Sequence, residues 1–501
     1  MTGLSFLCAK YNCALALNGG IIPPCQFAAT RQFCHLAHIC HFRQIGRMFE
    51  TIELPMWFVV IAAIFAAIAA LERALIPSVR WFFRRRMERV VSQLNARLDR
   101  PIEPFKLARR HDMIQRLLYH PDVMQAVNDH ARKEGIPENV AFQEAQKYAR
   151  EIVPSFSATV YFTVASTIAR FLSETLYRVR IGRFEDVLSG LDPKATVVFV
   201  MNHRSNMDYV LVTYLASKRS ALSYAVGEWA RIWPISLLIR AMGAFFIRRK
   251  SRGLLYRRVL ARYVQMATQG GVTQAVFPEG GLSLDGRLAP PRMGFLNYVI
   301  AGWEPKGRDV IFVPVSINYD RVLEDYILLA AGKRGERRFG ANISVIARFL
   351  AQQFWLWLTG RYRRFGYAAV HFGAPVSLSA FHKQTGGISS PVLAREIMAQ
   401  VEAGIPVLPV PLISLILIHK APLRALELTA AFAEVMQAVE PEYLQATPEA
   451  WAEAAEAGVL NLMQRKLIVQ DGGRYVITEK GKFVLPYYAA SLSHISEKLR
   501  E

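Results

Sequence analysis

The sequence predicts an α/β fold in which helices flank a central, mostly parallel sheet. From about residue 181 onward, short β-rich runs alternate with helical stretches such as 254–268, as in βαβ units. Polar motifs follow several of these runs directly, and ligand sites in such sheets lie at the carboxyl ends of the strands. The predicted strands are 196–201, 222–226, 244–247, 273–277, 310–318 and 368–372.

Composition places the chain among folded proteins with an anionic partner. Its 501 residues are 52% apolar and 20% charged, which excludes a disordered chain and allows two to four domains. The formal net charge is +21. A positive balance of this size points to nucleic acid, an anionic membrane surface or phosphorylated substrates.

Residues 1–47 remain unassigned. They hold all five cysteines, contain no Asp or Glu, and lack the order of charge, apolar run and cleavage site of a signal peptide. The cysteine and histidine spacings fit no common zinc pattern, so we expect no metal there. Because a plausible start, FETIELPMW, follows Met48, we expect an over-extended gene start. The cysteine-free body is typical of a cytoplasmic fold.

Residues 48–80 are predicted to form a membrane anchor. The run 54–71 is 18 residues long without a charge and reaches ~27 Å as a helix. Arginines interleaved with Trp81, Phe82 and Phe83 follow it, as at a membrane interface, and the positive-inside tendency places the remaining chain in the cytoplasm. A buried core helix is the alternative, and whether the helix spans the bilayer stays open.

Two helical regions flank the predicted sheet. Residues 81–180 show helical spacing and read as a basic, amphipathic helical region. Residues 404–501 form a C-terminal helical and hairpin region after the sheet domain, 181–403. The run 404–418 is too proline-rich to span a membrane, and we expect a buried strand or an interfacial segment. The tail predicts a helix followed by a hairpin that turns at Asp471, Gly472 and Gly473.

The first motif, NHRSNMD, follows the predicted strand 196–201. His203 would face a cleft at the end of that strand, and Asp208 would turn back to it across a tight loop. An aspartate on one imidazole nitrogen fixes the tautomer, so that the other nitrogen can take a proton from a substrate alcohol. A His and an Asp five residues apart are weak evidence by themselves, because most such pairs are incidental.

Two further motifs also follow predicted strands. GAFFIRR ends in Arg248 and Arg249, whose guanidinium groups suit bidentate phosphate recognition. FPEGGLS lets the backbone of Gly280 and Gly281 approach an anion, while Glu279 could bond a substrate hydroxyl or an arginine. Each could instead be a solvated turn. Arg287 and Arg292 add positive charge further along, and VPVSI is an apolar block that could wall an acyl channel or fill the core.

Together and in this order, NHRSNMD, GAFFIRR, FPEGG and VPVSI resemble the glycerolipid acyltransferase family, with wording nearest its bacterial glycerol-3-phosphate acyltransferases. The similarity runs from about residue 190 to the end, and the chain looks like a shortened relative without a long N-terminal domain. The resemblance implies His203 as general base and Asp208 as its orienter. It implies that the substrate is bound by Arg248, Arg249, Glu279, Gly280, Gly281, Ser283 and Arg292.

The implied reaction is attack of the 1-hydroxyl of sn-glycerol 3-phosphate on acyl-CoA or acyl carrier protein, with no cofactor and no metal. The implied location is the cell inner membrane, with the catalytic domain on the cytoplasmic side and anionic lipids as partners.

Leu282 stands where the family usually has an arginine. Acylation of lysophosphatidic acid is therefore the alternative. A winged-helix DNA-binding regulator is a distant alternative, and no nucleic acid is expected because the basic residues concentrate beside the apolar helix.

Overall fold

The computed structural model divides the chain into two compact units, Met1–Arg86 and Met87–Glu501. It describes residues 6–9, 12–17, 20–21, 55–98, 100–217, 220–227, 235–248, 253–335, 355–356, 358–360, 362–439 and 450–498.

The first unit contains a small antiparallel sheet and the beginning of a long helix. The strands are β1 (Phe6–Ala9), β2 (Asn12–Leu17) and β3 (Gly20–Ile21), and the helix is α1 (Met56–Asn95). In the part of the chain that the structure describes, no helix combines the length and the apolar character needed to cross a membrane. The predicted membrane helix at 54–71 is thus not confirmed, and residues 48–54 lie outside the described part.

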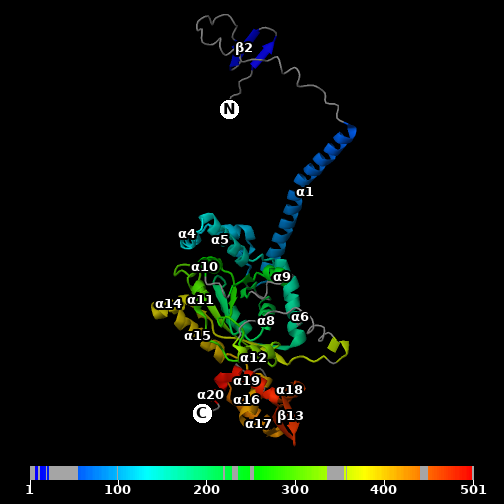
Figure 1. The fold of residues 1–501 in the computed structure, drawn as a ribbon, viewed down its shortest axis with the longest axis vertical. Helices are drawn as coiled ribbons and strands as arrows, with labels where there is room; N and C mark the ends of the chain where they lie inside the picture. The colour runs from blue at the N-terminus through cyan, green and yellow to red at the C-terminus, as the bar shows by residue number, and fades with distance from the viewer. Residues whose placement is uncertain are drawn as a thin grey trace. The chain divides into compact units, whose positions relative to one another are not determined.

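An eight-stranded sheet forms the centre of the second unit (Figure 1). Its order is β4-β10-β9-β5-β8-β6-β7, and β11 pairs with β9. Only the pairings of β9 with β10 and β11 are antiparallel, which agrees with the predicted mostly parallel sheet. The strands are β4 (Arg178–Gly182), β5 (Thr196–Met201), β6 (Ser223–Val226), β7 (Phe245–Phe246), β8 (Gln274–Val276), β9 (Val310–Tyr319), β10 (Tyr367–Phe372) and β11 (Val376–Ser377).

Helices cover both faces of this sheet, as the continuous apolar run of β5 requires. Side chains of β5 alternate between two cores: Val198 and Val200 enter one, and Val197 and Phe199 enter the other. The first core is closed by α3 (Arg110–Leu118), α4 (Pro121–Glu134), α5 (Glu138–Ile152), α10 (Leu254–Gln269), α11 (Met293–Ile300), α14 (Leu378–Thr385) and α15 (Ser390–Ala403). The second is closed by α6 (Ser166–Leu176), α7 (Phe184–Ser189), α8 (Met207–Ala216), α12 (Asp325–Arg334) and the C-terminal helices.

The region 81–180 is helical up to β4. Besides α3 to α6 it contains α2 (Pro104–Leu107) and a π-helical turn, Val160–Ala165. The end of α1 packs here, where Val91 and Leu94 contact a small cluster around Tyr161. The strand β4 pairs with β10 across nearly 190 positions of sequence, which no local pattern had indicated.

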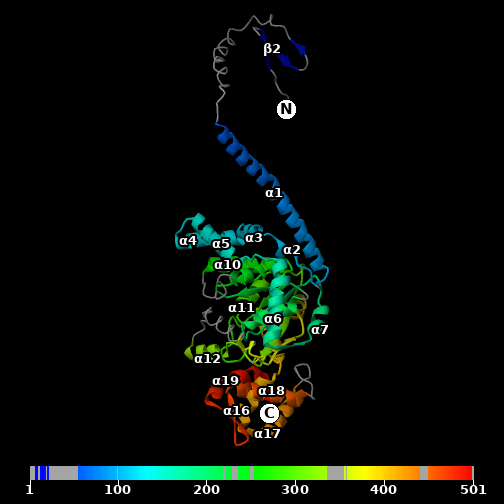
Figure 2. The same ribbon diagram turned by 90° about the vertical axis from the view of Figure 1, so that its right-hand side faces the viewer.

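The C-terminal region packs on the second core. The proline-rich run becomes α16 (Pro409–Lys420), buried from Pro409 to Leu417, so the predicted strand or interfacial segment is wrong. Prolines at the first positions of a helix cost no hydrogen bond. Around it lie α17 (Ala425–Ala438), α18 (Trp451–Gln464) and α19 (Glu479–Ala489) (Figure 2), and the last helix is α20 (Ser493–Lys498) (Figure 1). The hairpin of β13 (Ile468–Asp471) and β14 (Arg474–Ile477), with β12 (Leu423–Arg424) beside it, turns where predicted.

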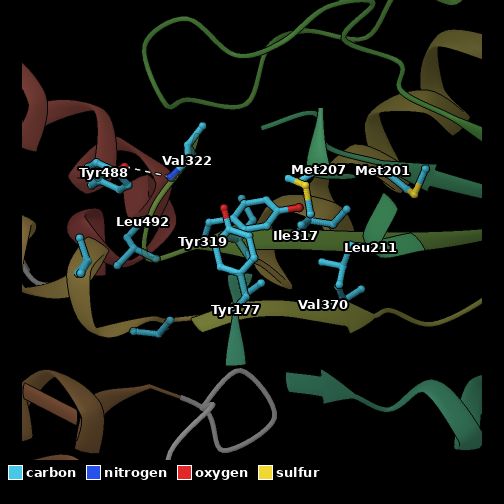
Figure 3. Close-up of a cluster of buried hydrophobic side chains, with 14 of the residues drawn as sticks. Tyr177, Met201, Met207, Leu211, Ile317, Tyr319, Val322, Val370, Tyr488 and Leu492 are labelled. Carbon is cyan, nitrogen blue, oxygen red and sulfur yellow. Dashed lines mark hydrogen bonds between the residues drawn. The ribbon is translucent and has the colours of Figure 1, made fainter. Parts of the chain in front are cut away.

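Specific contacts tie this region to the sheet. The backbone N–H of Val322, just after β9, donates to the Tyr488 hydroxyl of α19 at 3.0 Å (Figure 3). The same hydroxyl donates to Asp325, which also pairs with Arg465, the residue that follows α18. Tyr319, Tyr177 and Leu492 lie close by in the same buried cluster (Figure 3). The central sheet and the tail therefore share one core.

Candidate active site

The loop between β5 and α8 brings His203 and Asp208 together, as the sequence predicts. The Nδ1 atom of His203 lies 2.9 Å from Oδ2 of Asp208, and both side chains are buried. Asp208 sits in the first turn of α8, where backbone N–H groups point outward and favour a negative charge. Two backbone N–H groups of the preceding loop, from Arg204 at 2.7 Å and Ser205 at 3.0 Å, also donate to Oδ2 of Asp208.

The second oxygen of Asp208 has a different partner. The Tyr319 hydroxyl at the end of β9 donates to Oδ1 at 2.7 Å. Burial, together with the nearby Asp208 carboxylate, raises the pKa of Tyr319 well above its ordinary value, so the phenol keeps its proton and remains a donor. Asp208 is thus fixed at both oxygens, and it can hold the imidazole in one orientation.

Aromatic rings hold the His203 imidazole from two sides. Phe277 stacks on it at 4.1 Å between centroids, and Tyr209 meets it edge-on at 5.3 Å. Because Nδ1 faces Asp208, Nε2 is the nitrogen that can accept a proton from a reacting group. A base positioned in this way, with its tautomer fixed by a carboxylate, can activate a hydroxyl.

Glu279 lies beside His203, because β8 is the parallel neighbour of β5. Its Oε1 accepts the His203 backbone N–H at 2.7 Å, and its Oε2 accepts that of Ala289 at 2.9 Å. Burial raises the pKa of Glu279 to about 7, against the opposing effect of these two donors. Both hydrogen bonds of Glu279 are thus with backbone N–H groups of the surrounding loops. Its predicted role in binding the substrate stays a prediction.

The rest of the third motif shapes the loop around His203. The Ser283 N–H donates to the carbonyl oxygen of His203 at 2.9 Å, while its hydroxyl joins Arg287 O and Gly286 N in a tight turn. Gly280 has φ +69°, and a Cβ there would lie 2.7 Å from Cδ of Arg292. Arg292 is exposed, and its backbone N–H donates to Pro278. The structure therefore brings Gly280, Gly281, Ser283 and Arg292 to the same loop as Glu279.

Arg248 is placed apart from this group. Two strands, β8 and β6, separate β7 from β5, so the two strands lie roughly 14 Å apart at ~4.8 Å per strand. Its guanidinium pairs with Glu151 of α5 at 2.6 Å and lies over the rings of Tyr148 and Tyr256. Its predicted contact with a substrate phosphate stays a prediction. Arg249 lies outside the described residues.

Three residues around the site were missed by the sequence reasoning: Tyr319, Arg204 and Glu324. Arg204 is buried, donates to Gly286 O at 2.6 Å and stacks over Tyr487 of α19 at 5.1 Å. Glu324 accepts from the Ser205 hydroxyl at 2.7 Å and from Asn206. Tyr319, Glu324 and Tyr487 are more than a hundred positions away from the loop, so no local motif could have pointed to them.

The described residues contain no group of three His, Cys, Asp or Glu side chains that could hold a metal ion. The structure thus has a buried His–Asp pair at the carboxyl edge of a mostly parallel sheet, with Nδ1 of His203 on the aspartate. An arrangement of this kind can take a proton from a hydroxyl. Residues 179–318, the segment that contains His203 and Asp208, match the family model described as "Acyltransferase", so this segment is an acyltransferase-family domain.

Similar proteins were found among curated sequences and solved structures. The glycerol-3-phosphate acyltransferase of Pseudomonas putida (strain GB-1) is 29% identical over 282 residues, 56% of this chain and 33% of the relative. That of Pseudomonas aeruginosa (strain UCBPP-PA14) is 32% identical over 286 residues, 55% of this chain and 32% of the relative. The matched part spans about a third of the relatives' length. The 1-acyl-sn-glycerophosphate (LPA) acyltransferase PlsC of Thermotoga maritima matches at 18% identity and a TM-score of 0.32, covering 52% of this chain and 80% of that one.

Proposed function

We propose that the protein transfers a fatty-acyl group from acyl-CoA or acyl carrier protein to the 1-hydroxyl of sn-glycerol 3-phosphate, the first step of phospholipid biosynthesis. The observation that carries the proposal is the buried His203–Asp208 pair within the segment that matches the acyltransferase family. The glycerol-3-phosphate acyltransferases among the relatives support this acceptor.

In the proposed mechanism, His203 Nε2 takes the proton of the acceptor hydroxyl while its oxygen attacks the thioester carbonyl. Asp208 stabilises the imidazolium that forms, because its carboxylate lies 2.9 Å from Nδ1. The tetrahedral intermediate then collapses, the carbon–sulfur bond breaks, and the departing thiolate takes the proton back from the imidazolium. The ester and the free thiol leave, and His203 returns to its neutral form.

Positive charge near this loop supports a phosphorylated acceptor. Arg292 and Arg287 are both exposed on the segment that follows Glu279, so either guanidinium could meet a phosphate in solvent. Arg248, held by Glu151 and two aromatic rings, would need to exchange partners to do so.

The second candidate acceptor is lysophosphatidic acid. Leu282 stands where an arginine is usual in the resembling family, and it packs, half-buried, against the main core together with Leu284. An apolar side chain at this position would suit an acceptor that already carries an acyl chain, and would not add to a phosphate site.

Attachment to the cell inner membrane, with the catalytic domain on the cytoplasmic side, is part of this proposal. It is supported by α1, whose side chains between Met56 and Leu71 include many exposed large apolar groups, with Met56 78% and Phe65 69% exposed. Exposed apolar surface on this scale favours contact with lipid. Anionic lipids are the proposed partners, because basic and aromatic residues follow that stretch, and the Arg85 guanidinium lies 5.2 Å from the Trp81 ring.

The test is an acyl-transfer assay on membranes that contain the protein. Labelled glycerol 3-phosphate or lysophosphatidic acid would each be offered with acyl-CoA and with acyl carrier protein. His203→Ala should reduce transfer by about 10²–10⁴-fold, the usual contribution of a general base. His130→Ala is the matched control, since His130 pairs with Glu144 at 3.2 Å between α4 and α5. Transfer to the lysolipid alone would select the second candidate, and equal activity of both variants would refute the mechanism.

A further inference from the structure

A cavity of about 260 Å³ lies at the amino ends of β6 and β8, the edge of the sheet opposite to His203. Its lining combines apolar side chains with cations and contains no Asp or Glu. The residues that give it this character are Lys106, Arg109, Arg110, Phe105, Met113 and Tyr263.

Lys106 is the cation held most deeply among apolar groups. Its Nζ donates to Ala221 O at 2.7 Å and lies 4.6 Å from the Phe156 ring and 5.6 Å from the Tyr161 ring. Burial lowers the pKa of Lys106 well below its ordinary value. One backbone oxygen satisfies only one of the three donors of an ammonium group, so Lys106 retains donors for a ligand.

Two arginines outside the cavity lining, Arg150 and Arg240, lie close to Arg110. Arg110 donates to the carbonyl oxygens of Val153 and Arg150, and Arg240 donates to Arg150 O at 3.2 Å. Burial, and after it the charges of Arg240 and Arg150, lowers the pKa of Arg110. Because these side chains are partly removed from water, their positive charges repel one another more strongly than they would in solvent.

Among the described residues, no carboxylate forms an ion pair with the cations of this region, and Asp112, in the first turn of α3, is exposed to solvent. Within the described residues, none of the five cations Lys106, Arg109, Arg110, Arg150 and Arg240 forms an ion pair. The acidic residues of the neighbouring segments bind other arginines: Glu103 pairs with Arg308 and Glu151 with Arg248.

The start of α3 increases the positive potential. Arg109 is the N-cap residue of this nine-residue helix without a side-chain cap bond, and Arg110 is its first residue. The N-terminus of a helix carries a partial positive charge and favours anions, so two arginines there are unfavourable unless an anion joins them.

We propose that this cavity binds a phosphate-bearing amphiphile, with the phosphate among Lys106, Arg109 and Arg110 and an apolar chain against Phe105, Met113 and Tyr263. An anion there would relieve the repulsion among the cations, and the apolar wall would take the chain out of water. The site is distinct from the His203–Asp208 pair at the opposite edge of the sheet, and it does not depend on the proposed function. The amphiphile could come from a bilayer or from solution.

The experiment measures direct binding to the full chain in neutral detergent. The probe is short-chain dihexanoyl phosphatidylglycerol, which is neither a substrate nor a product of either proposed reaction. Arg109→Gln/Arg110→Gln removes two cations of the cavity. Arg116→Gln/Lys133→Gln is the matched control, since both residues are exposed on α3 and α4 and lose the same formal charge. Thermal unfolding of each variant checks that the fold is retained.

We expect one probe molecule to bind per chain and the affinity to fall by about tenfold in the cavity variant, since ~1.4 kcal/mol of lost interaction corresponds to tenfold. The control should bind like the wild type. An equal loss in both variants, or no saturable binding by the wild type, would overturn the proposal.

Two further arms test the chain and the source. Inorganic phosphate lacks a chain and should compete weakly; competition as strong as that of the lipid would overturn the apolar half of the site. Binding of each variant is also measured to vesicles that contain phosphatidylglycerol and to vesicles of phosphatidylcholine alone. If the cavity variant loses the additional binding to the phosphatidylglycerol vesicles, the source of the amphiphile is a bilayer. If only binding of the soluble probe is lost, the source is a free amphiphile, and both results support the site.

Discussion

Replacing Tyr319 with phenylalanine tests whether the outer partner of Asp208 positions the catalytic pair. Tyr319 is fully buried and its hydroxyl is the donor at 2.7 Å from Oδ1, whereas the other three donors to Asp208 bond Oδ2. The substitution removes one oxygen and keeps the ring, so the core around Tyr177 and Tyr488 should stay packed.

The expected size follows from the charge of the acceptor. A hydrogen bond to a buried carboxylate contributes about 1.5–3 kcal/mol, and its loss leaves Oδ1 buried without this donor. We expect the free energy of unfolding to fall by about 2 kcal/mol. With Asp208 held at one oxygen only, His203 is less firmly oriented, and kcat should fall by about tenfold, or ~1.4 kcal/mol of barrier. KM should change little, because Tyr319 lies behind Asp208 and does not meet substrate.

Tyr177→Phe is the matched control. Tyr177 is equally buried, its ring lies 5.3 Å from that of Tyr319, and its hydroxyl donates to the carbonyl oxygen of Arg321 at 2.7 Å. It should lose stability without losing kcat. Steady-state acyl transfer and chemical denaturation of both variants are the assays. If the two variants lose kcat to the same extent, the effect is one of packing, and the positioning argument is refuted.

Two further predictions concern the loops around His203. Because the pKa of Glu279 is raised from 4.5 to about 7, its contribution to stability is present below pH 4.5 and lost as the pH rises through 7. Denaturation of Glu279→Gln and wild type across this range should show the decline in the wild type only; parallel curves would contradict it. Gly286→Ala should destabilise by more than ~2 kcal/mol, since φ is +88° and its Cβ would lie 1.9 Å from Tyr487 O. Gly294→Ala is the comparison, since a Cβ there has no neighbour within 4 Å and should stabilise its helix by ~0.5–1 kcal/mol. Thermal unfolding measures both variants. A Gly286→Ala protein more stable than Gly294→Ala would contradict the packing of α19 against Gly286.

Local sequence sufficed for the central part of the site. The strand 196–201, the loop after it and the helix that begins at Met207 are contiguous, so a short loop can bring His203 and Asp208 together. The spacing was weak evidence by itself, and the resemblance of four motifs to one family singled this pair out. The prolines of α16 misled the reasoning, because they lie at the one end of a helix that tolerates them. The run 404–418 is apolar at nearly every position, which indicated that it is buried. A continuous apolar run has no periodicity, so it could not distinguish a buried helix from a buried strand.

The order of strands could not be predicted from the sequence, and that order decided which motifs meet. Glu279 and Arg248 both follow parallel strands, yet β8 lies beside β5 while β7 is the third strand from it. Glu279 therefore contacts the backbone of His203, and Arg248 pairs with Glu151.

The sequence by itself thus determined the fold class and the contact between His203 and Asp208, because each rests on residues close together along the chain, and its composition determined the net charge. Only the tertiary structure decided what supports and surrounds that pair. Tyr319, Glu324 and Tyr487 reach the loop from more than a hundred positions away, and Arg110 and Arg240 meet at the carbonyl oxygen of Arg150. Contacts of this kind are set by how layers pack, for which a single sequence carries no periodic signal.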